Sequence, residues 1–221
     1  MDAGPASPRR EVHCADALTW LAGCGVLAGT AAVTSLPDVS EVSLPLATWR
    51  TWFLGAVGRV IDAVPPTSGA VFFQSDIKRD GAWVDKGALV LRAAEDAGAR
   101  VLFHKIICRG PPGRLTPGRP GYTHLIAVSR AASCPNELPI PDVITDPGPA
   151  PWVRAMGVRA AGHAVRFVRD HLGARTVLDP FCGVGTVLAA ANAAGLDAVG
   201  VDLSRKRCER ARELVLRPDE I

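Results

Sequence analysis

The residues best placed to do chemistry lie near the end of the chain, in the segment Thr176–Thr186, which reads TVLDPFCGVGT. A short buried-strand pattern ends at Asp179, and glycines follow at positions 183 and 185, before a helix pattern begins. Glycines there let the backbone pass close beneath a ligand, and a helix start carries unpaired N–H donors. The next strand pattern ends at Asp202, where a carboxylate suits a ribose diol. The spacing indicates a nucleoside-like ligand.

Three interpretations of this segment compete. It could be a strand–helix turn without a ligand, or a nicotinamide dinucleotide site. The dinucleotide fingerprint needs a third glycine or alanine where this chain has Leu188. A site for S-adenosylmethionine has no pyrophosphate to hold and does not need that third glycine, so the pattern favours this ligand.

The cofactor segment also resembles a known family. LDPFCGVGT followed by AVGVD is similar to the first two cofactor motifs of the class I S-adenosylmethionine-dependent methyltransferases. The DPF-x-G-x-GT form is most similar to the N4/N6 amino-methyltransferases of DNA and RNA bases. The resemblance implies an N-methyltransferase with S-adenosylmethionine as its cofactor and no metal. It implies a cofactor site made of Asp16, Asp179, Pro180, Phe181, Cys182, Gly183, Gly185, Thr186, Asp202 and Leu203.

In the common order of this family the cofactor motif opens the domain, whereas here it closes the chain. The opening VHCADALTWLAG and the later TSLPD are similar to the start of the circularly permuted DNA amino-methyltransferases. This resemblance places Asp16 near the cofactor's adenine amine and makes a catalytic loop of Ser35, Leu36, Pro37 and Asp38. Leu36 replaces the first proline of that loop, and Asp38 stands where an aromatic residue usually stacks on the base. The alternative is an ordinary turn after a strand.

The chemistry of such a loop follows from the acceptor. The exocyclic amine of a base is planar, and it must become pyramidal to attack a sulfonium methyl. Acceptors that bond both amine hydrogens favour that geometry and the charge that develops. The Ser35 hydroxyl, the Leu36 carbonyl and the Asp38 carboxylate are the candidates.

A basic loop at residues 109–122 (RGPPGRLTPGRPGY) supplies the candidate substrate residues Arg109, Arg114, Arg119 and Tyr122. Cations with an interleaved aromatic suit single-stranded nucleic acid, although a solvated surface loop has the same composition. No segment is long enough for a separate reader of duplex sequence, which favours RNA slightly over DNA. Two alternatives stay open. One is a methyltransferase for a small molecule or a protein side chain, and the other is a non-catalytic cofactor-binding subunit.

Strand and helix patterns alternate along most of the chain. This predicts a Rossmann-like, doubly wound α/β fold with a seven-stranded sheet and an antiparallel hairpin at one edge. We expect the strand at 176–178 to lie beside the strand at 29–35. The predicted organisation is a flexible tail (1–10) and a single domain (11–221), which comprises a catalytic and substrate half (11–130), a linker (131–150) and a cofactor-binding half (151–221).

Composition sets broad limits on the partners. The chain of 221 residues is 48% hydrophobic with a net charge of +3, which permits a polyanionic partner without requiring one. The uncharged stretch 17–37 is interrupted by glycines and predicts a helix, a turn and a strand rather than a membrane span. Six cysteines without a C-x-x-C pair indicate reduced thiols, and we expect a cytoplasmic protein. A homodimer or a partner subunit is compatible with the sequence.

Overall fold

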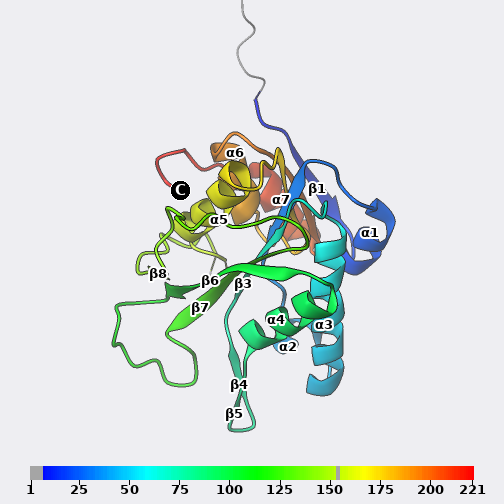
Figure 1. Cartoon of the computed structure of the whole chain (residues 1–221). Coiled ribbons are helices and arrows are strands. Elements are labelled where there is room, and N and C mark those ends of the chain that lie inside the picture. Colours follow the sequence, from blue (N-terminus) through cyan, green and yellow to red (C-terminus); the bar gives the residue numbers. More distant parts are fainter. Residues whose placement is uncertain (1–6, 153–154) are drawn as a thin grey trace, which may run out of the picture.

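The fold is built on one eight-stranded sheet in a computed structural model, which describes residues 7–152 and 155–221 (Figure 1). Every pairing in the sheet is parallel except the two made by β7. In spatial order the strands are β1 (Arg10–Cys14), β10 (Asp197–Asp202), β9 (Thr176–Asp179), β2 (Thr30–Thr34), β3 (Ala70–Gln74), β7 (Tyr122–Ser129), β6 (Arg100–Cys108) and β8 (Val143–Ile144).

The predicted α/β class is confirmed, but the sheet has eight strands instead of seven. The additional strand is β8, in which Val143 pairs with Ile106 and Ile144 with Ile107. Two residues are too few to show an alternating pattern in the sequence. Because β8 covers the outer side of β6, the predicted hairpin of β6 and β7 lies one strand inside the edge.

The permuted strand order is visible in the middle of the sheet. Thr30 of β2 pairs with Thr176 of β9, and Ala32 pairs with Leu178, as the sequence predicted. β1 pairs with β10, so both ends of the sequence contribute to the same half of the sheet. Of the predicted tail at 1–10, residues 1–6 lie outside the described residues and Arg10 begins β1.

Helices cover both faces of the sheet. One apolar core lies under α5 (Val158–Asp170), α6 (Thr186–Ala193) and α7 (Arg205–Glu213). The other lies under α1 (Ala17–Cys24), α2 (Val39–Val42), α3 (Leu46–Asp62) and α4 (Lys86–Asp96). Trp49 and Phe53 of α3 are fully buried in this second core. α6 therefore leaves β9 towards one face, while α2 and α3 follow β2 towards the other.

One small element was absent from the sequence-based prediction. β4 (Ile77–Arg79) and β5 (Ala82–Val84) form a separate two-stranded hairpin that projects from the body (Figure 1). Its turn residues Asp80 and Gly81 have φ of 50° and 80°. Two positive φ angles are typical of a type I′ turn, for which Asp-Gly is a strong signal.

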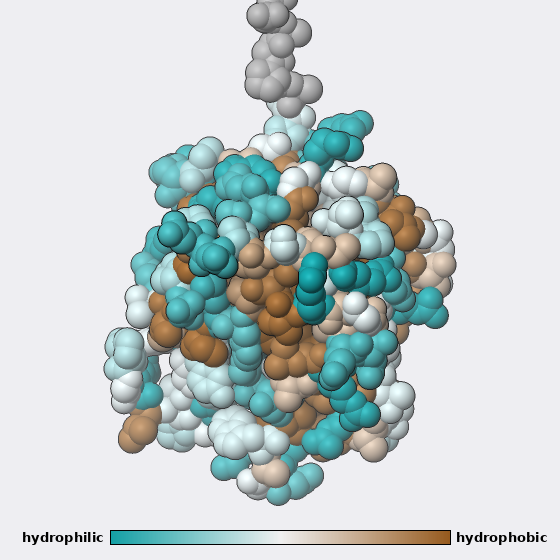
Figure 2. All heavy atoms as spheres, in the orientation of Figure 1, coloured by the Kyte–Doolittle hydropathy of each residue, from teal (hydrophilic) through white to brown (hydrophobic). Residues whose placement is uncertain are grey.

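The surface carries apolar residues at the centre of one face, with hydrophilic side chains on both sides (Figure 2). The stretch 17–37 forms α1, a turn and β2, as predicted. Within the described ranges, no helix has the length and apolar character needed to cross a bilayer.

Gly185 offers a test of how α6 is positioned. Its φ is +86°, and a Cβ at this position would lie 2.7 Å from Cα of Ala211 in α7. We expect Gly185→Ala to lower the free energy of unfolding by about 3 kcal/mol, from backbone strain and overpacking together. Gly195→Ala is the matched control, because Gly195 has φ of +82° but nothing within 4 Å of its Cβ position. It should cost about 1 kcal/mol in urea titrations. Equal losses would contradict the packing role of Gly185.

Candidate functional site

Two adjoining cavities open at the carboxyl ends of the central strands. The first, of about 480 Å³, lies over β2, β9 and β10, and the second, of about 640 Å³, lies over β2, β3 and β6. The chain leaves β9 and β2 towards opposite faces, so the first cavity sits at the switch point of the sheet. Open α/β sheets bind their ligands at this position.

The glycine loop forms the floor of the first cavity. Gly183 has φ of +55°, and nothing lies within 4 Å of the position of its missing Cβ. The loop backbone is therefore open to a ligand there. Gly185 does not line the cavity, because its close neighbour is α7. Only one of the two glycines thus faces the space where a ligand would bind.

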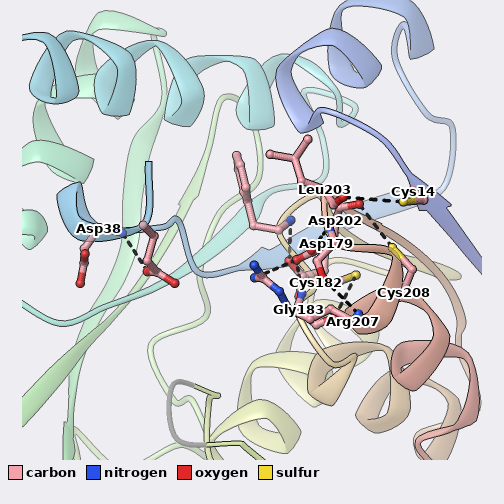
Figure 3. Close-up of polar contacts among 12 residues, drawn as sticks. Cys14, Asp38, Asp179, Cys182, Gly183, Asp202, Leu203, Arg207 and Cys208 are labelled. Atoms are coloured by element: carbon pink, nitrogen blue, oxygen red, sulfur yellow. Dashed lines mark hydrogen bonds and ion pairs between the residues drawn. The ribbon is translucent and has the colours of Figure 1, made fainter. Parts of the chain in front are cut away.

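Asp202 is fixed at the end of β10 and is 7% exposed. One carboxylate oxygen accepts a hydrogen bond from the Ser204 N–H at 2.7 Å. The other accepts from the Gly183 N–H at 3.1 Å and from Arg207 at 3.4 Å, and Figure 3 shows this group of residues. These bonds aim a carboxylate at the first cavity, which it lines.

Asp179 is a second buried carboxylate, 4% exposed, at the end of β9. Its Oδ1 accepts from the Thr34 hydroxyl at 2.6 Å and from the Phe181 N–H at 3.2 Å. Burial raises the pKa of Asp179 to about 7, and the charge of Asp202 adds to this rise, although the two hydrogen bonds oppose it. A cation bound beside this carboxylate would favour its charged form.

Other wall atoms of the first cavity are unsatisfied or apolar. The Thr186 hydroxyl is buried and has no partner among the described residues. The ring of Trp52 packs edge-on against Phe181, with centroids 6.0 Å apart, and Leu203 is exposed at the rim. Burial raises the pKa of the Cys182 thiol strongly, which leaves it protonated and unsuited as a nucleophile. The cavity thus combines two carboxylates, an unsatisfied hydroxyl and flat apolar walls.

Nine of the ten residues expected to bind a cofactor line this cavity. They are Asp16, Asp179, Pro180, Phe181, Cys182, Gly183, Thr186, Asp202 and Leu203, with Gly185 the exception. Asp16 also caps α1 by accepting from the Thr19 N–H at 2.8 Å.

The loop Ser35–Asp38 lies between the two cavities. Ser35 and Leu36 line both of them, Pro37 lines the first, and Asp38 lines the second. The Leu36 side chain is 2% exposed, and the Pro37 carbonyl accepts from the indole N–H of Trp49 at 3.3 Å. The loop is held by the α3 side of the core and brings its backbone to the junction of the cavities.

Asp38 also has a structural role, because it caps the helix that follows the loop. Its Oδ1 accepts from the Ser40 N–H at 2.8 Å, while Glu41 accepts from the Asp38 N–H at 3.1 Å, which makes a capping box for α2. In Figure 3 Asp38 lies apart from the group of Asp179 and Asp202. The turn interpretation of this residue is therefore confirmed, and its catalytic role stays a prediction.

The second cavity is lined by more cations than carboxylates, five against three. Of the four residues expected to bind substrate, Arg109 and Arg119 line it, whereas Arg114 and Tyr122 do not. Its wall contains three further cations that were not expected from the sequence, which are Lys78, Arg79 and Lys86.

Lys86 is the most buried of these cations, at 5% exposed. Burial lowers its pKa, although the charges of Asp38 and Glu41 oppose the shift. Lys86 begins α4 just after β5, a strand of three residues that is too short to be recognised in the sequence. The sequence therefore did not indicate that Lys86 lines a cavity.

Two comparisons place this geometry among known proteins. A family model of the N6/N4 methyltransferases, described as DNA methylase, matches residues 173–213, which include the glycine loop and Asp202. No curated protein matches the sequence significantly.

Solved structures match over nearly the whole chain. TTHA0409 of Thermus thermophilus, assigned as a DNA modification methylase and solved with S-adenosyl-L-methionine, has a TM-score of 0.71 at 19% identity, covering 92% of each chain. M1.HpyAVI in complex with S-adenosylmethionine has a TM-score of 0.62 at 17% identity, covering 92% of this chain and 98% of that one. The PvuII cytosine-N4-specific DNA methyltransferase has a TM-score of 0.76 at 13% identity, covering 95% and 88%. These matches show the fold, and the family model over residues 173–213 confirms the predicted resemblance to the amino-methyltransferases.

The raised pKa of Asp179 predicts a pH dependence of stability. The group takes up a proton near pH 7 in the folded chain, against an ordinary value of 3.8. Its contribution to the free energy of unfolding is therefore fully present below pH 4 and is lost as the pH rises to about 7. In urea unfolding, the free energy of unfolding of the parent should fall relative to that of Asp179→Asn as the pH rises from about 4 to about 7. Above that pH the difference between the two proteins should stay constant. Asp96→Asn, at an exposed carboxylate of α4, is the control. A constant difference would contradict the shift.

Proposed function

We propose that the chain is an S-adenosylmethionine-dependent methyltransferase that methylates an exocyclic amine of a base in DNA. The observation that carries the proposal is the junction of the two cavities at Ser35 and Leu36. One cavity is walled by the segment that the family model matches, and the other has a cationic wall suited to a nucleotide. The matching family and the fold support both the enzyme class and the cofactor.

The first cavity fits the cofactor by its donor set. The fixed carboxylate of Asp202 suits the ribose diol, and Asp16 and Leu203 suit the adenine. Asp179 and the unpartnered Thr186 hydroxyl suit the charged methionine end. When bound, the cofactor supplies an electrophilic methyl on a sulfonium.

The acceptor is held from the other side of the junction. The Ser35 hydroxyl and the Leu36 carbonyl can accept the two amine hydrogens, which makes the nitrogen pyramidal and exposes its lone pair. This nitrogen would be the nucleophile for the methyl that the cofactor supplies, and one of its protons would pass to solvent. The Asp38 carboxylate, on the wall of the second cavity, stabilises the positive charge that develops on the nitrogen.

DNA is proposed in place of the RNA that the sequence slightly favoured. The family model is described as DNA methylase, and the matching structures are assigned as DNA enzymes. The preference for RNA had rested on the absence of a segment long enough to read duplex sequence, and it is not supported by these matches.

A second candidate rests on one specific observation. Leu36 and Asp38 replace a proline and a stacking aromatic of the family loop, and Asp38 caps a helix. A small-molecule or protein acceptor, or a cofactor-binding subunit that acts with a partner chain or as a homodimer, would need no stacking residue there. The absence of salt-sensitive retention on DNA would favour the small-molecule or protein acceptor, and co-purification with a second chain would favour the cofactor-binding subunit.

Cofactor binding is the first test. We expect titration calorimetry to detect S-adenosylmethionine and its demethylated product, but not NAD. Asp202→Ala should weaken binding by about 1–3 kcal/mol, because the ribose loses a charged hydrogen-bond acceptor. Asp197→Ala, at the opposite end of β10, is the matched control and should bind normally. Tight NAD binding without a response to S-adenosylmethionine would end the proposal.

Asp38 can be tested with two substitutions, because asparagine caps helices well and alanine does not. If the carboxylate stabilises the reacting amine, both Asp38→Asn and Asp38→Ala should lower kcat by about a hundredfold or more. Cofactor affinity should hardly change, since Asp38 does not line the first cavity. Activity is measured on duplex DNA, with the melting temperature as the folding control. Full activity in Asp38→Asn, with a melting loss only in Asp38→Ala, would reduce the residue to a cap.

A further inference from the structure

The β4–β5 hairpin is built as a stiff projection. Its strands pair in the order Ile77 with Val84, Lys78 with Trp83 and Arg79 with Ala82. It makes no strand pairing with the main sheet, and it extends outward from the body (Figure 1). The two left-handed turn residues give the right-handed twist of a tight ribbon.

The two ends of this ribbon are tied together at its base by Asp76, which is 8% exposed. Its carboxylate accepts from the Lys86 N–H at 2.8 Å, from the His124 ring at 3.2 Å and from the Tyr122 hydroxyl at 3.3 Å. Burial alone would raise the pKa of Asp76, but these bonds outweigh it and the pKa is lowered. The ribbon is therefore anchored to both α4 and β7.

The exposed side chains of the ribbon combine positive charges with an aromatic ring, which suits a partner that has phosphates and planar bases. Lys78 and Trp83 are cross-strand partners, and the ammonium lies 5.8 Å from the ring centroid. Trp83 is 51% exposed, which is unusual for so large an aromatic. Arg79, also exposed, lies beside Lys78 in the wall of the second cavity.

A second cationic element faces the ribbon across the second cavity. The connection between β6 and β7 (residues 109–121) carries Arg109, Arg114 and Arg119, and it projects on the same side of the body as the ribbon (Figure 1). Arg109 and Arg119 line the cavity together with Lys78 and Arg79. In the two elements five cations accompany one carboxylate, Asp80.

We propose that the β4–β5 ribbon enters the major groove of duplex DNA and that the 109–121 loop holds the backbone on the other side of the methylated base. This inference rests on the proposed function. A two-stranded ribbon fits the major groove of B-form DNA, whereas the deep, narrow groove of duplex RNA excludes it. Lys78 and Arg79 contact phosphates and base edges, and the exposed ring of Trp83 adds an apolar contact in the groove. The ribbon thereby takes the place of a separate recognition domain.

Binding of a labelled duplex of about 25 base pairs, measured across a salt series, tests this proposal. The double variant Lys78→Ala/Arg79→Ala should bind about ten- to hundredfold more weakly and lose about 2 from the slope of log affinity against log salt. Trp83→Ala should weaken binding with an unchanged slope, because it removes no charge. Arg205→Ala/Lys206→Ala, on exposed α7, is the charge-matched control.

The outcomes separate the two proposals. If the parent methylates DNA and the double variant binds duplex with the parent's affinity and slope, the ribbon proposal is overturned and the proposed function stands. If the parent neither binds nor methylates DNA although it binds S-adenosylmethionine, the proposed function fails first. If the double variant loses affinity for single-stranded RNA but not for duplex DNA, the assignment of duplex DNA is overturned. Circular dichroism verifies that each variant is folded.

Discussion

The pairing of β2 with β9 is the constraint on which the rest of the site depends. It joins an early strand to a late one, and the buried bond from the Thr34 hydroxyl to Asp179 at 2.6 Å reinforces it at the end where the cavities open. The loops that follow these strands leave towards opposite faces of the sheet. The space between them becomes the junction at which a cofactor and an acceptor can meet.

Most of the residues named for the cofactor line the first cavity, and they could be named from the sequence because their signals are local. Gly183 has a left-handed backbone, Asp202 ends a buried strand, and Leu188 disfavours the dinucleotide alternative. The adjacency of β2 and β9 could be predicted only through the family resemblance, since no local pattern pairs strands so far apart. The role of Gly185 was not visible either, because its close neighbour Ala211 comes from another helix.

The acceptor half was harder to predict, for physical reasons that differ from residue to residue. The Asp80-Gly81 turn signal was present but stood between strands of only three residues each. β8 has two residues, and its identity depends entirely on its partner β6. The capping role of Asp38 could have been found, because Glu41 stands three residues later in the pattern of a capping box. The buried position of Lys86 depends on the tertiary packing of α4.

The departures in the loop Ser35–Asp38 are consistent with the way this chain holds it. In place of the first proline, Leu36 anchors the loop by its burial in the α3 core, and the indole N–H of Trp49 donates to the Pro37 carbonyl. In place of an aromatic residue, Asp38 caps the short helix α2 and places its carboxylate in the wall of the second cavity. A base in that cavity must then be stacked and held by residues outside the loop. Under the proposed function, the ribbon that follows β3 through Asp76 is carried by the strand next to β2, so that recognition would have a fixed position relative to the chemistry.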